Sequence, residues 1–320
     1  MFVPDVGRLP GPPIDPGQGD HAIKPVINVT PGGLTRAEAE AIRSAGQANR
    51  VTRSPGGSIE CEFTAYIGQY QGGDWNSTVR VDPDGKIGTG SLPNLLYLMS
   101  YWSRDKIKTN YKNVRAIRLD SGDLFTMKPP FIFLTGTEDF VLTDKEVANL
   151  REYIRVGGCV WGDSSVPGLR SRFDLAFRRE MKRVIPDVGT NFEPLPADHP
   201  LFTNGYFPKV RQVPSGLNFY QLPVYALKTH GEISILYTAN DYGDMWQIGL
   251  DSKGEIDLRT DSLHRYVAIN PSLYGLRDIY VRNMSPKALD ESYRFGTNMV
   301  MHLVTRWDDK VNRVLGATAL

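Results

Sequence analysis

One stretch of the chain, residues 131–165, constrains the fold more than any other. It opens with the wholly apolar run FIFL, which is typical of a strand buried on both faces of a parallel sheet. Thr143 and Glu146 have the spacing of a helix capping box, and apolar residues then recur at helical spacing. Gly157 and Gly158 follow, as expected where a helix ends and the chain turns into a strand. The stretch therefore predicts a strand–helix–strand crossover of an α/β domain.

The second strand of this crossover is predicted at residues 159–162, and polar side chains follow it directly. Asp163, Ser164 and Ser165 stand just past its carboxyl end. Because ligands bind at that edge in open α/β sheets, we expect a functional site of the domain there.

Strands and helices alternate along most of the chain. Apolar periodicity predicts strands at residues 59–67, 114–119, 220–227 and 233–237, helices at 92–102, 170–185 and 288–306, and a polar loop at 240–246. This order predicts a doubly wound, mostly parallel sheet in a three-layer α/β/α domain over residues 57–310, with a C-terminal tail over residues 311–320.

The first 56 residues differ from the rest. The run GRLPGPPIDPGQG is rich in proline and glycine, and one short helix is predicted at residues 34–48, with Thr35 as N-cap and Glu38 at the capping-box position. Such an arm cannot bury enough apolar surface to fold alone. We expect residues 1–56 to wrap their own domain or a neighbouring subunit, with the second favoured, and so to serve in a homo-oligomer or a larger protein assembly.

The charge balance and the apolar pattern exclude several classes of partner. The 37 basic and 36 acidic residues nearly cancel, which gives no electrostatic footprint for nucleic acid. No apolar run approaches the roughly 18 residues of a transmembrane helix. The first residues lack the features of a signal peptide, so the compartment stays open: periplasmic or envelope-associated if a signal peptide has been removed, cytoplasmic otherwise.

Several phrases resemble, in order, a bacterial family known as domain of unknown function 4159. They are Gly72–Trp75, Leu92–Leu96, Leu134–Gly136, Thr143–Glu146, Leu150–Arg151 before Gly157–Gly158, Asp198–Phe202, Asn240–Gly243 with Trp246, and Phe295–Asn298. That family resembles a ThuA-like branch of the class I glutamine amidotransferase-like superfamily, which implies a flavodoxin-like fold. The resemblance also implies MoxR-type ATPases or von Willebrand A-domain proteins as partners.

The chain departs from the amidotransferases at their nucleophile. Their cysteine stands on the turn after the strand, whereas Cys159 begins the strand here, which places it more than about 10 Å from the tip. We therefore expect Cys159 and Cys61 to be small core residues, although a disulfide or a reactive thiol stays open. Ser164 with His199 as base is the candidate catalytic pair, and the competing interpretation of His199 is a loop anchor before a proline. The balance favours a domain without catalysis.

A pocket and a metal site are both conceivable at the carboxyl edge. The candidate pocket residues are Asp74, Trp75, Glu138, Asp139, Asp163, Ser164, Asp241 and Trp246. No cofactor is predicted, but Asp74, Asp163 and Asp241 could together hold a divalent metal such as magnesium or calcium. The competing interpretation is that these acids cap helices and turns. Trp75 and Trp246 could stack on a sugar ring, but packing is favoured.

The leading functional hypothesis is a non-catalytic amidotransferase-like scaffold that self-assembles or binds a protein partner through its arm and its carboxyl-edge loops. The alternative is a ThuA-like enzyme or carbohydrate-binding protein that uses the carboxyl-edge cleft. A third hypothesis, from the family resemblance, is a subunit that changes conformation under an ATPase partner.

Overall fold

The computed structural model describes residues 33–44, 49–54, 58–187, 189–247 and 284–316. All of them belong to one compact unit, residues 33–320. Most of the expected arm, residues 1–32 with 45–48 and 55–56, lies outside this description. None of the helices in these ranges is long and apolar enough to cross a membrane.

The core element is an eight-stranded sheet. Its strand order is β11 (Glu193–Pro194), β12 (Tyr225–Thr229), β13 (Glu232–Thr238), β10 (Cys159–Ser164), β9 (Phe131–Gly136), β3 (Tyr66–Gln69), β8 (Val114–Arg118) and β5 (Lys86–Ile87). The five central strands, from β13 to β8, are parallel to one another, and the outer three pair antiparallel. The expectation of an α/β domain with a mostly parallel sheet is confirmed.

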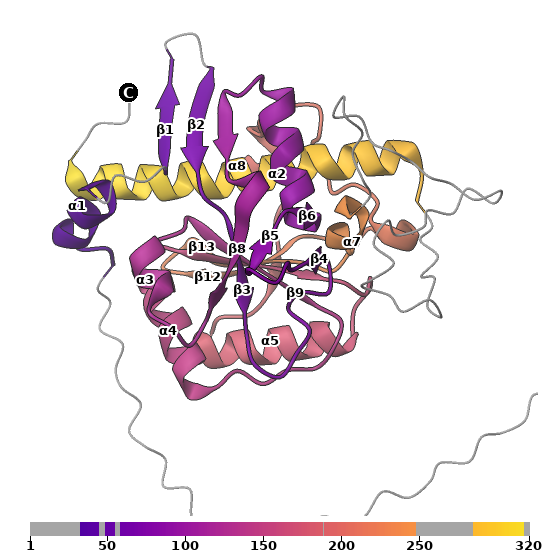
Figure 1. The fold of residues 1–320 in the computed structure, drawn as a ribbon, viewed down its shortest axis with the longest axis horizontal. Coiled ribbons are helices and arrows are strands. Elements are labelled where there is room, and N and C mark those ends of the chain that lie inside the picture. The colour runs from indigo at the N-terminus through magenta and orange to yellow at the C-terminus, as the bar shows by residue number, and fades with distance from the viewer. Residues whose placement is uncertain (1–32, 45–48, 55–57, 188, 248–283, 317–320) are drawn as a thin grey trace, which may run out of the picture. The chain divides into compact units, whose positions relative to one another are not determined.

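Helices cover both faces of this sheet (Figure 1). α2 (Ser91–Trp102), α6 (Pro200–Thr203), α7 (Tyr242–Trp246) and α8 (Pro286–Leu315) share one hydrophobic cluster with the sheet. α3 (Asp123–Met127), α4 (Asp144–Arg155) and α5 (Arg172–Val184) share a second cluster with its other face. Helices on both faces explain why β9 and β10 are buried along their whole length.

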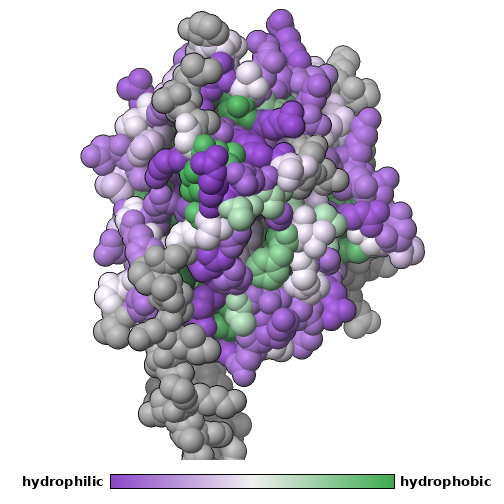
Figure 2. Space-filling view, turned by 90° about the vertical axis from the view of Figure 1, so that its left-hand side faces the viewer, coloured by the Kyte–Doolittle hydropathy of each residue, from purple (hydrophilic) through white to green (hydrophobic). Residues whose placement is uncertain are grey.

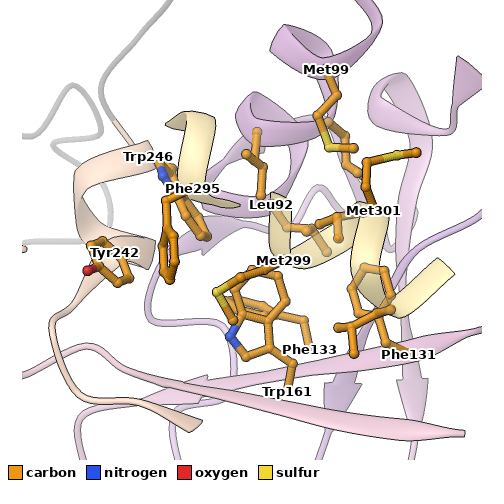
Figure 3. Close-up of a cluster of buried hydrophobic side chains, with 14 of the residues drawn as sticks. Leu92, Met99, Phe131, Phe133, Trp161, Tyr242, Trp246, Phe295, Met299 and Met301 are labelled. Atoms are coloured by element: carbon orange, nitrogen blue, oxygen red, sulfur yellow. The ribbon is translucent and has the colours of Figure 1, made fainter. Parts of the chain in front are cut away.

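Side chains that alternate along β9 and β10 divide between these two layers. Phe131, Phe133 and Trp161 point to the α8 side, where Figure 3 shows them below Met299 and Met301. Ile132, Leu134 and Val160 belong to the opposite cluster.

The capping box that introduces α4 is present as predicted, because the Thr143 hydroxyl accepts from the Glu146 N–H and the Glu146 carboxylate accepts from the Thr143 N–H.

The strand expected at residues 59–67 is in fact two strands in two sheets. β2 (Ile59–Phe63) joins a small three-stranded sheet with β1 (Arg50–Arg53) and β7 (Ile107–Thr109), and β3 alone enters the main sheet. The Asn110 side chain holds the break, since its amide accepts from the Ala65 N–H and donates to the Ala65 carbonyl, both at 2.9 Å. Likewise the strand expected at 220–227 begins only at Tyr225.

The part of the arm within the described ranges lies on its own domain. α1 (Arg36–Ser44) begins with the predicted Thr35–Glu38 capping box. It packs Ala39 and the preceding Leu34 against α8. Figure 2 views the side on which α1 lies in Figure 1 and shows a mainly hydrophilic surface with a few hydrophobic residues near its centre.

Four short elements lie outside the two larger sheets and the helices named above. β4 (Val79–Arg80) pairs with β6 (Thr89–Gly90), and two 3-10 turns span Tyr111–Asn113 and Leu217–Phe219. α8 is 30 residues long and continues to Leu315, so residues 311–315 are helical.

Candidate functional site

The carboxyl ends of β3, β9, β10 and β13 bring most of the predicted site residues to one edge of the sheet. Asp163 is the centre of this region, at the end of β10, and its side chain is fully buried. The Thr238 hydroxyl at the end of β13 donates to one Asp163 oxygen at 2.5 Å. The Gly243 N–H in the first turn of α7 donates to the other at 2.6 Å. Asp163 thus links the sheet to the helix layer.

Burial outweighs these two hydrogen bonds in the electrostatics of Asp163. Burial raises the pKa of its carboxyl to about 7, the bonds from Thr238 and Gly243 act in the opposite direction, and the nearby Asp244 raises it again. The charged and the protonated forms are therefore both populated near neutral pH. A carboxyl with this pKa has the acidity of a general acid–base group, but its oxygens are occupied by internal donors.

The stretch expected to be a polar loop at 240–246 is instead a buried turn of helix. Asp241 adopts left-handed angles, φ 57 and ψ 53, and caps α7 by accepting from the Asp244 N–H at 3.2 Å. The Asn240 side chain accepts from the Leu222 N–H at 2.7 Å and donates to the Leu222 carbonyl at 2.9 Å. Hydrophobic Tyr242, Met245 and Trp246 then fill the core between α7 and the sheet.

The two serines that follow Asp163 serve the turn after β10. The Ser164 hydroxyl donates to the Val166 carbonyl at 2.7 Å and lies 3.2 Å from the Ser171 hydroxyl that caps α5. The Ser165 hydroxyl lies between those of Thr135, at 2.8 Å, and Ser77, at 3.0 Å. None of residues 163–166 has a positive φ, so the strained turn that presents a nucleophile in amidotransferases is not present at this place.

Asp74 connects the loops after β3 and β9. Its carboxylate accepts from the Thr137 N–H at 2.9 Å, from the Thr137 hydroxyl at 2.5 Å and from the Glu138 N–H at 3.1 Å. Glu138 and Asp139 extend outward and pair with Arg172 at 2.6 Å and Arg179 at 3.0 Å. Asp74 thus acts as a loop cap, and Glu138 and Asp139 are surface ion-pair partners.

The two tryptophans expected beside a pocket lie in different environments. Trp75 is partly buried and packs against both hydrophobic clusters. Trp246 is fully buried and contacts Trp161 edge to face, with ring centroids 5.8 Å apart (Figure 3). The α7 turn thus directs the Trp246 ring into the core.

His199 lies at the other end of the sheet from Ser164. Its Nδ1 accepts from the Leu201 N–H at 3.2 Å as the cap of α6, and its ring lies edge to face with that of His302, centroids 5.2 Å apart. Burial lowers the pKa of His199, as does Lys228, which is paired with the start of β13. Asp163, beside Ser164, is paired instead with Thr238 at the end of β13. The structure therefore does not bring Ser164 and His199 together.

Both cysteines are free and buried. Burial raises the pKa of Cys61 to about 12, with a further contribution from Asp308, and that of Cys159 to about 11. Cys159 stands at the start of β10, in the α8-side hydrophobic cluster. Neither thiol has the exposure or the acidity of a nucleophile.

The metal candidates do not converge. Within the ranges that the structure describes, no three His, Cys, Asp or Glu side chains are gathered as a metal site would require. Asp74, Asp163 and Asp241 each accept hydrogen bonds from their own surroundings instead.

The phrases that carry the family resemblance have structural roles at these places. The Asn94 side chain donates to the Trp246 carbonyl at 2.8 Å, and Asn298 binds both the N–H and the carbonyl of Phe207. A methyl group on Gly296 would lie 2.6 Å from the Trp246 ring. A family model described as Domain of unknown function (DUF4159) matches residues 69–304. The chain belongs to this family. A search among curated proteins found no match.

Two contributors to the site could not be recognised in the sequence. Thr238 and Gly243 bind Asp163 from 75 and 80 positions away, and neither has a local pattern that marks it. Gly243 does belong to the family phrase Asn240–Gly243, but that phrase does not indicate a contact with Asp163.

Proposed function

We propose that this member of the DUF4159 family is a non-catalytic scaffold that self-assembles or binds a protein partner through its carboxyl-edge loops and its N-terminal arm. Numbered along the chain, the five central strands have the order 2-1-3-4-5. That order supports a flavodoxin-like, doubly wound fold and is consistent with a ThuA-like branch of the class I glutamine amidotransferase-like superfamily.

The observation that carries the proposal is the state of the β10 tip. The resemblance to the amidotransferases implies a nucleophile at the position of Asp163, Ser164 and Ser165, and each of these three side chains is buried and hydrogen-bonded within the domain. The cysteine of the same strand is a core residue. The polar groups of this edge form hydrogen bonds that hold its own loops, and they are not free to act on a substrate. This supports a domain that binds another protein through the surface of these loops.

Hydrophobic side chains are exposed on loops of this same edge and supply such a surface. Leu169 is 48% exposed, Phe219 60% and Tyr220 43%. The Gly168 backbone packs against the Tyr220 ring, which brings the two loops together. Phe219 is held at φ 63 after Asn218 at φ 52, and left-handed angles are costly for an aromatic residue. Exposed, conformationally strained hydrophobic residues are typical of a protein-binding surface.

The mass of the full chain in solution, by light scattering on a sizing column, tests self-assembly. We expect a dimer or larger species whose mass falls in Phe219→Ser/Tyr220→Ser but not in the control Tyr101→Ser, which changes a 50% exposed residue on α2. Affinity capture with a MoxR-type ATPase or a von Willebrand A-domain protein tests whether the chain binds a protein partner. A wild-type monomer that captures neither partner and whose arm is freely cleaved by protease would refute the proposal.

One observation favours a ThuA-like enzyme or carbohydrate-binding protein as a second candidate. A shallow hollow of about 370 Å³ beside the β3 and β9 loops is lined by Gln71, Gly72, Asp139, Phe140 and Val141. The Gln71 and Asp139 side chains are exposed there and offer an amide and a carboxylate to the hydroxyl groups of a sugar. Ligand-observed NMR with neutral mono- and disaccharides tests it. Saturation transfer that is lost in Asp139→Asn would support this candidate, and the absence of transfer would eliminate it.

A further inference from the structure

A second site lies at the opposite, amino-terminal edge of the sheet. The start of β13, residues 298–313 of α8, α6 with the loop after it, the end of β1, the start of β2 and the loop before β7 line an open cavity of about 610 Å³. This volume is within the roughly 300–1,000 Å³ of small-molecule sites. Nothing in the proposed scaffold function uses this cavity.

Three cations of α8 converge on one carboxylate in this cavity. Arg306, Lys310 and Arg313 approach Glu232, the first residue of β13, at 3.7, 3.1 and 3.4 Å. Positions i, i+4 and i+7 share one face of a helix, and like charges at such spacing repel. One carboxylate cannot neutralise three cations.

Burial increases the cost of this arrangement. Arg306 and Lys310 are largely buried, with side chains 14% and 20% exposed. Burial lowers the pKa of Lys310, Glu232 acts in the opposite direction, and Arg306 and Arg313 lower it further. The fold thus keeps like charges together in a partly desolvated cavity, where an added anion would be strongly attracted.

The rim adds to the positive surplus. Arg53 pairs with Asp309 at 2.9 Å, and Lys106 makes no ion pair with any residue in the described ranges. The lining therefore has five basic and two acidic side chains, a surplus of three positive charges. His302 also lines the cavity and adds no charge near neutral pH, since burial, then His199 and Arg306, lower its pKa to about 4.

We propose that this cavity binds a small polyanion with at least two negative charges, of the phosphate or polycarboxylate class. The negative charges of the bound anion would offset the positive charge that Glu232 and Asp309 do not neutralise. The Lys106 ammonium on the rim would be the first cation to contact the entering anion. A nucleic acid is a poorer fit, because the whole chain has a net charge of only +1 and the positive charge is confined to one cavity.

Calorimetric titration of the full chain at low salt tests the proposal, with pyrophosphate and citrate as separate probes that distinguish the two chemical classes. We expect at least one to bind at one site, with affinity that falls as sodium chloride is added. Lys106→Gln/Arg313→Gln should weaken binding about tenfold or more. Both side chains are exposed, so the variant should fold, and its unfolding midpoint without ligand checks this. The charge-matched control Lys112→Gln/Lys145→Gln changes exposed lysines outside the cavity and should bind like wild type.

Glu232→Gln should change the affinity for the anion in the opposite direction to Lys106→Gln/Arg313→Gln. Removal of the carboxylate that competes for the cations should strengthen binding of the same probe while it lowers stability without ligand. A merely structural ion-pair network would lose stability in Glu232→Gln and show no binding in any variant. Absence of binding by both probes, or equal binding by the cavity variant and the control, overturns the proposal.

Discussion

The backbone N–H of Gly243 donates a 2.6 Å hydrogen bond to the buried carboxylate of Asp163, 80 positions earlier in the chain. This bond joins the first turn of α7 to the tip of β10. The Asp163 carboxyl therefore helps to position the edge loops. Because its pKa is raised by folding, the free energy of unfolding depends on pH through this group.

The first prediction is that Asp163→Asn changes how stability depends on pH. The pKa of Asp163 is raised from 3.8 to about 7, so the folded state holds a proton that the unfolded state releases between pH 4 and 7. Stability from this group is therefore greatest below pH 4 and declines as pH rises to 7, by about 2–4 kcal/mol. Asparagine does not titrate. Wild type should therefore lose stability relative to Asp163→Asn as the pH rises from 4 to 7, so that the free energy of unfolding of the variant minus that of wild type increases.

Urea unfolding at pH 4.5, 6 and 8 measures this difference. Asp105→Asn, at an exposed position, is the matched control and should show no such trend. A constant difference across these pH values would mean that Asp163 is ionised throughout.

The second prediction concerns the closeness of α7 to β10. A methyl group on Gly243 would stand 3.0 Å from the Asp163 carboxylate and 3.2 Å from the Thr78 side chain. Gly243→Ala should therefore lower the free energy of unfolding by about 1–3 kcal/mol, as overpacking does. Gly122→Ala, where nothing lies within 4 Å, should change it by less than about 1 kcal/mol. Equal effects of the two substitutions would show that α7 can shift away at little cost.

Elements with local signals could be predicted from the sequence, and contacts between distant segments could not. β9, α4 and β10 follow from an apolar run, the Thr143–Glu146 box and a glycine pair, all within one stretch. The division of residues 59–67 depends on Asn110, 45 positions away, and apolar alternation does not reveal a change of sheet. The polar residues of 240–246 suggested an exposed loop, whereas the structure has a buried turn there. The Asp241 and Asn240 side chains are buried because they form hydrogen bonds with backbone groups of the same region.

The third prediction is that neither thiol reacts in the folded protein. Cys61 and Cys159 are 5% and 0% exposed, and burial raises the pKa of both. A chromogenic disulfide reagent at pH 8 should label neither residue in buffer and both in denaturant, because the thiolate is the reactive form. Rapid labelling of Cys159 in the folded state, traced by peptide mapping, would show an accessible and reactive thiol at β10 and contradict the scaffold proposal.

The fourth prediction is that Arg43 fastens α1 to α8. Arg43 donates to Asp308 at 2.8 Å, and the Asp308 side chain is only 2% exposed, with Asn312 as a further donor at 3.0 Å. Arg43→Ala leaves that buried carboxylate without its cation, which should cost about 1–3 kcal/mol, less than a fully buried pair because Arg43 is 27% exposed. Much of that cost should appear as local opening of α1.

Limited proteolysis with mass spectrometry follows this opening. Cleavage within residues 36–44 should be several-fold faster in Arg43→Ala than in wild type. Arg36→Ala is the matched control on the same helix, since Arg36 pairs with Glu40 at side-chain exposures of 71% and 57%, and such surface pairs contribute only about 0–1 kcal/mol. If both variants are cleaved at the wild-type rate, the apolar contact of Leu34 and Ala39 with Trp307 and Val311 suffices to hold α1 without the ion pair.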